Sequence, residues 1–224
     1  MTNVTIVSAF RNSDVLSYRQ RIEGLRIPQS QLRLVCVEGD STDNTLGYLQ
    51  AWVFERRDMV IVKCDTHRPH YGSVVNAERF ETLATVFNAG LNAVDLKWSD
   101  YVMFLPSDIE YAPDLIGRLL AHDKDLIAPF MWMNGRFYDI WGFVDLHGRN
   151  FEPFTPDEVV QRYGAKPFQM MMVGGVILMS ADVVRKGCRY STQDVDHGLC
   201  RDALARGFTV WADPSTNVFH PVHY

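Results

Sequence analysis

Residues 102–113 read Val-Met-Phe-Leu-Pro-Ser-Asp-Ile-Glu-Tyr-Ala-Pro, an apolar run that ends at two carboxylates, Asp108 and Glu110. The run predicts a buried strand, and a carboxylate at the carboxyl end of a parallel strand lies where open α/β sheets bind ligands. Hard divalent cations prefer oxygen ligands and often leave most of their coordination shell to phosphates and water. The stretch therefore favours a metal held against a diphosphate. The alternative is a solvated turn in which Asp108 caps a helix.

Strands and helices alternate along the half of the chain that precedes this run. Continuous apolar segments predict strands at 4–9, 32–37, 59–63 and 101–105. Apolar positions at helical spacing predict helices at 15–25, 46–54 and 76–94. This alternation is typical of a parallel sheet with helices on both faces.

The half that follows the run is less regular. We expect helices at 115–121 and 194–206, short strands at 126–129 and 208–212, and a buried apolar segment at 173–179. Residues 130–168 are rich in aromatic residues, Gly and Pro, and they show no clear period. Because we find neither an internal repeat nor a linker, we expect one α/β domain.

The composition argues against several classes of protein. The chain of 224 residues has a formal net charge of −5, whereas a general nucleic-acid binder needs a basic surface. It contains no run of about 18 apolar residues that would predict a membrane span. Its first residues enter a strand pattern at once, which leaves no room for a signal peptide. Because the four cysteines show no CxxC spacing, we expect a protein of the reducing cytoplasm.

Polar residues follow three of the expected parallel strands. The groups are Ser8-Ala9-Phe10-Arg11-Asn12, Glu38-Gly39-Asp40 and Asp108-Ile109-Glu110. Because the carboxyl ends of parallel strands share one edge of a sheet, the three groups should converge there. The sequence after the first strand has neither a GxGxxG pattern nor a Walker lysine, which argues against a dinucleotide dehydrogenase and a P-loop NTPase.

Three other features allow two interpretations each. Asp194, in Gln193-Asp194-Val195-Asp196, could cap a helix or act as a general base. His220 and His223 could belong to an ordered tail or to a site. The aromatic stretch that includes Trp132 and Trp141 could stack on a sugar or a nucleobase, or form the core of an irregular region.

The chain resembles the GT-A nucleotide-diphospho-sugar glycosyltransferases. Its first half is similar to family 2, through Glu38-Gly39-Asp40-Ser41-Thr42-Asp43-Asn44-Thr45. Its second half is similar to family 62, the fungal mannan mannosyltransferases. That likeness is carried by 107–113, 122–129, Tyr138-Asp139-Ile140-Trp141, Val173-Gly174-Gly175, 180–183 and 217–220. The resemblance implies a single GT-A domain over 1–224, with a mostly parallel Rossmann-like sheet. Residues 1–110 would bind the nucleotide sugar, and 111–224 would bind the acceptor.

The resemblance also implies roles for individual residues. Asp108 and His220 would bind Mn²⁺ or Mg²⁺, and whether Glu110 or His223 joins them stays open. The residues implied at the nucleotide are Ser8, Ala9, Arg11, Glu38 and Asp40. Those implied near the rest of the donor are Asn88, Ser107, Gly174 and Gly175. The chain departs from the family's DxD motif, because Pro106 replaces the first acid.

The two halves of the resemblance imply different stereochemistry. Family 2 enzymes invert and use an acid of an ED segment as the base, which points to Asp194, with Asp196 beside it. Family 62 enzymes retain and need no such base. Family 62 enzymes also carry a Golgi membrane anchor, whereas this sequence favours a cytoplasmic enzyme of bacterial or viral (phage) origin.

The expected activity is metal-dependent transfer of a hexose or pentose from a UDP- or GDP-sugar to an acceptor hydroxyl. The acceptor would be a glycan or a hydroxymethylated base in phage DNA. Two alternatives stay open at this point: a nucleotidyltransferase, and a non-catalytic module that binds nucleotide sugars or glycans.

Overall fold

The computed structural model describes residues 2–72 and 75–221. The strands are β1 (Val4–Phe10), β2 (Leu32–Glu38), β3 (Met59–Lys63), β4 (Tyr101–Phe104), β5 (Glu110–Tyr111), β6 (Leu126–Met133), β7 (Arg136–Phe137), β8 (Phe168–Gln169), β9 (Ile177–Ser180) and β10 (Val210–Phe219). The helices are α1 (Val15–Glu23), α2 (Thr45–Glu55), α3 (Ala77–Asn92), α4 (Leu115–Leu120), α5 (Pro156–Tyr163), α6 (Ala181–Arg185) and α7 (Asp196–Ala205), with a short 3₁₀ helix, η1, at Gln29–Gln31.

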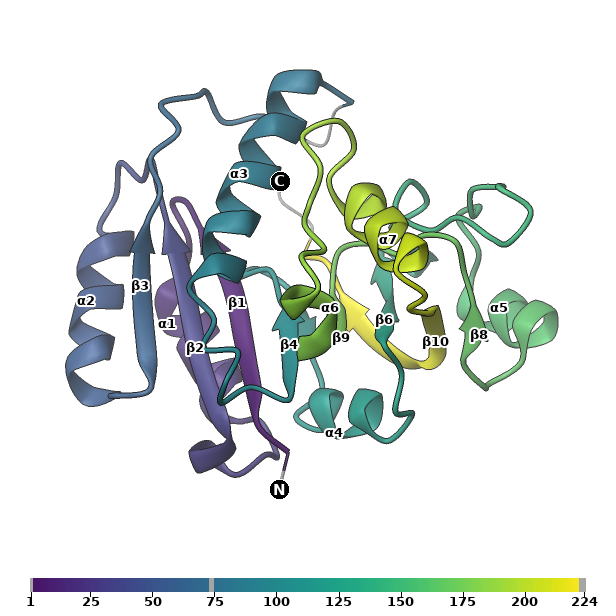
Figure 1. The fold of residues 1–224 in the computed structure, drawn as a ribbon, viewed down its shortest axis with the longest axis horizontal. Helices are drawn as coiled ribbons and strands as arrows, with labels where there is room; N and C mark the ends of the chain where they lie inside the picture. The colour runs from purple at the N-terminus through teal and green to yellow at the C-terminus, as the bar shows by residue number, and fades with distance from the viewer. Residues whose placement is uncertain (1, 73–74, 222–224) are drawn as a thin grey trace.

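These strands form one mixed sheet in the order β3-β2-β1-β4-β9-β6-β10-β5, with β7 beside β6 and β8 beside β10 (Figure 1). Strand β1 pairs in parallel with β2 and β4, and β2 pairs in parallel with β3. Strand β9 is antiparallel to both β4 and β6, and β6 is parallel to β10. The strands β1–β4, β6 and β10 therefore point the same way, and their carboxyl ends share one edge of the sheet.

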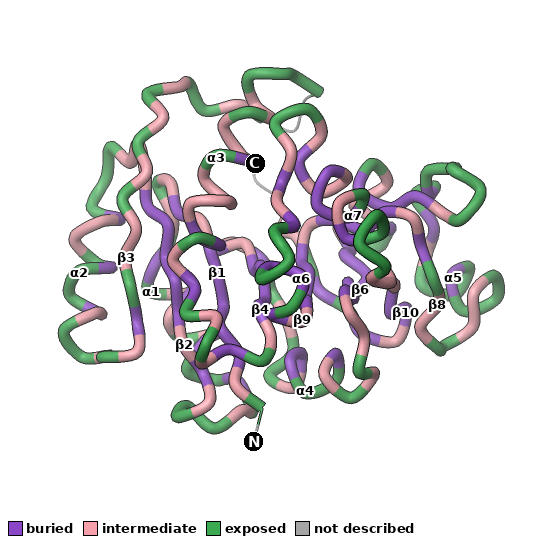
Figure 2. The backbone as a smooth tube through the Cα atoms, in the orientation of Figure 1, coloured by how far each residue is buried: buried purple, intermediate pink, exposed green. Residues whose placement is uncertain are grey.

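Helices cover both faces of the sheet, as the alternation predicted. One core packs α1, α2 and α4 against the sheet, and the other packs α3, α6 and α7 against the opposite face. In Figure 1, α3 and α7 lie in front of the strands and α1 lies behind them. The central strands are buried on both faces (Figure 2), which explains their continuous apolar sequences.

The second half is more ordered than the sequence predicted. Strand β6 continues to Met133, and β10 continues to Phe219 across an irregularity between Asp213 and Asn217. Both strands are longer than expected. Their pairing with each other continues past Pro129 in β6 and past the irregularity in β10. The aperiodic stretch 130–168 contains β7, α5 and β8.

The structure bears on two of the features that the sequence left open. Helix α7 begins at Asp196, its cap position is Val195, and no side chain caps it, so Asp194 is not the N-cap. Most aromatic residues of the irregular stretch are core, with Phe137 and Phe143 almost completely buried, but Trp141 is 68% exposed. Within the described parts of the chain, none of the helices is long and apolar enough to cross a membrane.

Candidate active site

The carboxyl ends of β4 and β10 bring Asp108 and His220 together. Strand β5 pairs with the end of β10, Glu110 opposite Phe219, and this pairing holds the two segments side by side. As a result, Asp108 Oδ2 lies 3.9 Å from His220 Nε2. Glu110 is exposed on β5, and His223 lies outside the described residues.

Contacts around His220 fix the orientation of its imidazole. The His220 backbone N–H donates to the Trp132 carbonyl at 2.8 Å, and the ring packs on Tyr138 with 4.5 Å between centroids. Nδ1 lies 2.9 Å from the Pro221 carbonyl, which can only accept, so Nδ1 carries the proton. In the neutral ring Nε2 then holds the lone pair, on the side that faces Asp108, and this is the tautomer that a metal ligand requires.

The Asp108–His220 pair is a small donor set. Across residues 2–72 and 75–221, no cluster of three or more His, Cys, Asp or Glu side chains could enclose a metal ion. One carboxylate and one imidazole nevertheless fit a divalent cation that takes its remaining ligands from a diphosphate and water. The site therefore suits a cation that binds together with a substrate.

The residues expected at the nucleotide lie at the ends of β1 and β2, and most are bonded to the protein itself. Ser8 is fully buried, where its hydroxyl donates to the Leu105 carbonyl at 2.5 Å. Ala9 is partly exposed at the end of the same strand. The Arg11 guanidinium donates to two carbonyls of the loop after β3, those of Arg68 and Pro69.

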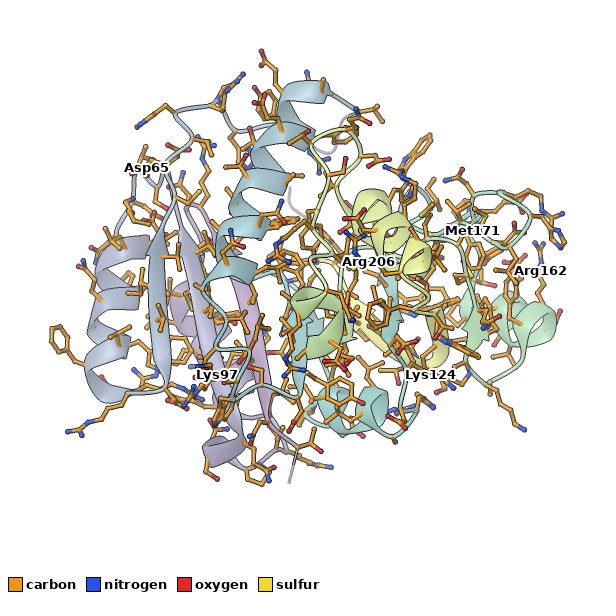
Figure 3. All side chains as sticks on the ribbon, in the orientation of Figure 1. Asp65, Lys97, Lys124, Arg162, Met171 and Arg206 are labelled. Carbon is orange, nitrogen blue, oxygen red and sulfur yellow. The ribbon has the colours of Figure 1, made fainter. Side chains whose placement is uncertain are left out.

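The two acids at the end of β2 are also bonded internally. Glu38 is fully buried, and Lys63 Nζ donates to its Oε2 at 2.6 Å, whereas its Oε1 has no partner. Asp40 accepts from Thr66 N–H, Thr66 O–H and His67 N–H at 2.7–3.0 Å. Although burial alone would raise the pKa of Asp40, these three hydrogen bonds lower it overall. Its own N–H donates to Asp65, which lies at the upper end of the sheet in Figure 3.

Asn88 and Ser107 form hydrogen bonds within the protein. The Asn88 amide exchanges two hydrogen bonds with the backbone of Tyr190, at 2.9 and 3.0 Å, and so anchors the loop before α7. Ser107 is 9% exposed, its hydroxyl lies 3.3 Å from that of Ser13, and its carbonyl accepts from Arg21.

A second group of acids gathers around Gly174 and Gly175, which the sequence singled out, and around Gly142, which it did not. A Cβ on Gly174 would lie 2.9 Å from Asp139 Oδ2 and 3.1 Å from Asp196 Oδ2. A Cβ on Gly142 would lie 2.5 Å from both oxygens of Asp139, and Gly175 is similarly restricted, with φ +68°. The glycines therefore make room for the two carboxyl groups.

The two carboxyl groups are enclosed even though their residues are only half-buried. Asp139 Oδ2 and Asp196 Oδ1 are sealed from solvent and have no hydrogen-bond partner, and the same holds for the hydroxyl of Tyr190. Burial raises the pKa of Asp139 to about 6, although the N–H of Gly142 lowers it. Burial and then the neighbouring Asp139 raise the pKa of Asp196 to about 8. Two such carboxyls cannot both ionise easily, so near neutral pH the pair holds a proton.

Asp194, the other acid before α7, has a different environment. It forms a bidentate ion pair with Arg201 on α7. Burial raises the pKa of Asp194, but the Arg201 guanidinium outweighs this effect and lowers it overall. The two aspartates that the sequence offered as bases therefore differ, because Asp194 is neutralised by a cation and Asp196 faces another acid.

Comparisons with known proteins define the fold. No protein-family model matches the chain. The chain is 23% identical over 163 residues to procollagen galactosyltransferase 2 of Mus musculus and 24% identical to the Homo sapiens protein of that name. Each match covers 67% of this chain but only 26% of the relative, so the chain corresponds to a minor part of those proteins.

Solved structures superpose over almost the whole chain. The TM-score is 0.67 with S. aureus TarS in complex with UDP-GlcNAc, at 13% identity, covering 100% of this chain and 59% of that one. It is 0.63 with the mannosyltransferase PcManGT from Pyrobaculum calidifontis in complex with GDP-Man and Mn²⁺, at 13% identity, covering 99% and 57%. It is 0.65 with GalNAc-T7 with UDP, GalNAc and Mn²⁺, at 14% identity, covering 99% and 43%.

This chain has the GT-A fold. The predicted architecture, a mostly parallel α/β sheet with helices on both faces, is thereby confirmed. Because the parallel strands of this fold end at one edge of the sheet, the polar residues that follow them lie close together. Ligands of open α/β sheets bind at this edge.

Sequence reasoning quoted Asp139 only within a motif of the resemblance and gave it no role, and it did not consider Tyr190, whose buried hydroxyl has no partner. Asp139 is the only acid in the aromatic stretch 130–143, and an acid in such surroundings is a signal that could have identified it. Tyr190 carried no signal, because nothing in a sequence tells that a buried hydroxyl lacks a partner.

Proposed function

We propose that this chain is a metal-dependent glycosyltransferase that moves a sugar from a UDP- or GDP-sugar to an acceptor hydroxyl. The observation that carries the proposal is the approach of Asp108 and His220, which come from opposite halves of the chain and have their side chains 3.9 Å apart. The GT-A fold supports the same conclusion, as do the nucleotide sugars bound by structural neighbours. In this proposal residues 1–110 hold the donor and residues 111–224 hold the acceptor.

Asp108 and His220 would hold Mn²⁺ or Mg²⁺ against the diphosphate of the donor. When bound, the cation neutralises charge on the leaving group. The fixed tautomer of His220 and the packing of Tyr138 on its ring keep Nε2 directed at this position. Ala9 and Arg11, which are partly exposed at the end of β1, are the residues available to the nucleoside, whereas Glu38 is fully buried.

Asp196 is the base that we propose for an inverting transfer. The acceptor oxygen bonds to the anomeric carbon, the bond from that carbon to the phosphate oxygen breaks, and its electron pair leaves with the nucleoside diphosphate. The hydroxyl proton passes to the ionised form of Asp196, whose raised pKa makes it a stronger base than an ordinary carboxylate. Asp139 acts through Asp196, because its charge favours the protonated product state.

The test is release of nucleoside diphosphate from UDP-glucose, UDP-galactose, UDP-GlcNAc and GDP-mannose with Mn²⁺ or Mg²⁺. We expect slow hydrolysis of at least one donor, inhibition by EDTA, and a loss of about 100-fold or more in Asp108→Ala and in His220→Ala. Asp157→Ala, which removes an exposed acid of α5, is the matched control.

Two results would contradict the proposal. Donor binding without release under any of these conditions would indicate a non-catalytic module. Release that is equal in Asp108→Ala and the wild type would remove the role of the Asp108–His220 pair.

A further inference from the structure

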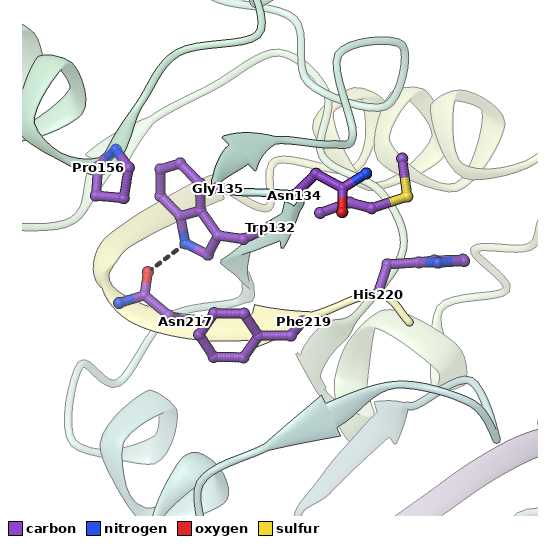
Figure 4. A pocket seen from close by; sticks show the side chains of 8 residues that line it. Trp132, Asn134, Gly135, Pro156, Asn217, Phe219 and His220 are labelled. Carbon is purple, nitrogen blue, oxygen red and sulfur yellow. Dashed lines mark hydrogen bonds between the residues drawn. The ribbon is translucent and has the colours of Figure 1, made fainter. Parts of the chain in front are cut away.

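A pocket of about 180 Å³ opens beside His220, at the carboxyl ends of β6 and β10. Figure 4 shows the side chains that line it, which include Trp132, Asn134, Pro156, Asn217, Phe219 and His220. The pocket lies on the same edge of the sheet as Asp108, so it extends the candidate active site towards the second half of the chain.

Hydrogen bonds fix the walls of this pocket. Trp132 is buried, and its Nε1–H donates to Asn217 Oδ1 at 2.7 Å, as the dashed line in Figure 4 marks. Because Oδ1 is already an acceptor for the indole, the amide nitrogen of Asn217 is the group that can donate to a ligand. Asn134 and Gly135 form the tight turn between β6 and β7, with φ +51° and +71°. The turn holds the Asn134 amide at the rim.

Phe219 gives the pocket an apolar surface that faces solvent. Its side chain is 51% exposed, although its strand, β10, is paired with β5 on one side and β6 on the other. Its neighbours along β10 show the usual alternation, since Val218 is fully buried. An exposed aromatic ring beside a fixed amide is typical of a site that binds one face of a ring-shaped ligand.

The chemistry of the lining selects the ligand. Among the described residues that line the pocket there is no Lys, Arg, Asp or Glu, and His220, at the end nearest Asp108, is their one titratable side chain. A volume of about 180 Å³ holds several water molecules, which is room for one small ring. The amide groups of the lining can hydrogen-bond to hydroxyls of a ligand, and the aromatic ring of Phe219 can pack against its C–H face.

We infer that this pocket is an acceptor subsite that binds the pyranose ring of an uncharged saccharide, with Phe219 against the ring and Asn217 at its hydroxyls. The inference rests on the proposed function for its place in the reaction. The neutral lining favours a saccharide over a base in DNA, whose flanking phosphates would need cations that the pocket does not provide.

The experiment is a ligand-observed NMR titration of the full chain, without donor, with methyl α-mannopyranoside, methyl β-galactopyranoside and methyl β-glucopyranoside. We expect saturable binding of at least one, weakened about three- to tenfold in Phe219→Leu and largely retained in Phe219→Tyr. Phe54→Leu, which changes a phenylalanine that is 89% exposed on α2, is the matched control. Asn217→Asp keeps an acceptor for Trp132 but removes the amide donor, and we expect it to weaken binding as well.

The outcomes separate this inference from the proposed function. If no pyranoside binds, or if Phe219→Leu and Phe54→Leu bind equally, the subsite is wrong even where donor hydrolysis occurs. Binding of 5-hydroxymethyl-2′-deoxycytidine in place of every pyranoside would also overturn it. Pyranoside binding that depends on Phe219 supports the subsite even if no donor is hydrolysed, a result that would count against the proposed function alone.

Discussion

The carboxylates at the two ends of the sheet edge differ in their partners. At the ends of β1 and β2, each carboxylate is neutralised by the protein, Glu38 by Lys63 and Asp40 by three N–H and O–H donors. Near β6 and α7, Asp139 and Asp196 face each other, and within the described residues neither forms an ion pair. Buried groups without partners destabilise a protein and persist mainly where they serve a function. Glu38 Oε1 also lacks a partner, but its carboxylate is paired with Lys63, whereas the two acids of the second region have no counter-ion among the described residues. The first region is therefore preorganised, and we propose that a substrate contacts the second.

The largest expected effect comes from removing the proposed base. Asp196→Asn keeps the shape of the side chain but cannot accept a proton, and general bases typically contribute about 10²- to 10⁴-fold. We expect kcat to fall in that range. Asp194→Asn, at the acid that is already paired with Arg201, should cost about tenfold or less, mostly through a shift of the loop before α7. Steady-state kinetics measure both, and a larger loss in Asp194→Asn would reverse the assignment.

The second prediction concerns the space around Asp139. Gly174→Ala places a methyl group 2.9 Å from Asp139 Oδ2, so the carboxyl must move. We expect an activity loss of about 10²-fold from misplacement and a free energy of unfolding lower by about 1–3 kcal/mol from overpacking.

Gly117→Ala on α4 is the matched control, since a Cβ there meets no atom within 4 Å. A helix interior favours Ala over Gly by about 0.5–1 kcal/mol, so this variant should be neutral or more stable in urea unfolding. Equal activity of Gly174→Ala and the wild type would show that the position of Asp139 does not matter.

The third prediction concerns the pH dependence of stability that the buried acid pair causes. Asp196 has a pKa of about 8 in the folded state, against about 3.9 in an unfolded chain. Above pH 4 the unfolded state ionises first, so the wild type loses stability as the pH rises towards 8. Asp196→Asn does not titrate, so its advantage should grow from pH 5 to pH 8. We expect at least about 1 kcal/mol at pH 8, or roughly 2–4 °C in Tm. Thermal unfolding at both values checks this, and an advantage independent of pH would contradict it.

The smallest effect should come from the preorganised region. Asp40→Asn weakens three hydrogen bonds to the loop after β3, and we expect a loss of about 1 kcal/mol of stability near neutral pH. Because the folded-state pKa of Asp40 is lowered, its contribution is present above about pH 4 and is lost as the pH falls. Urea unfolding should show a larger difference from the wild type at pH 7 than at pH 3. An equal difference at both would mean that the charge of Asp40 is irrelevant.

The sequence predicted the first half of the fold better than the second. Strands such as β1 and β2 are buried on both faces, so their apolar runs identify them. Strand β10 contains Asp213, Pro214 and Ser215, and it is a strand because β6 pairs with it on one side and β8 and β5 on the other. Such pairing is a tertiary effect that a local pattern does not reveal.

The candidate site was predictable to a similar degree. Asp108 was found from its place after an apolar run, and the structure puts it beside His220, whose role in metal binding stays a prediction. Ser8 and Asn88 came from the resemblance, yet their polar groups are bonded within the protein. Asp139 was not singled out for a role, because its significance depends on enclosure by residues distant in sequence.

The glycines around Asp139 have an evolutionary consequence. A Cβ at Gly142 or Gly174 would meet the Asp139 carboxyl, whereas Gly175 is restricted by Met131 and by its φ of +68°. Natural variants of this protein should therefore keep glycine at 142 and 174 wherever an acid of this size is retained at 139. Larger residues should appear at those two positions only together with a smaller residue at 139, so the three positions are expected to change as a unit.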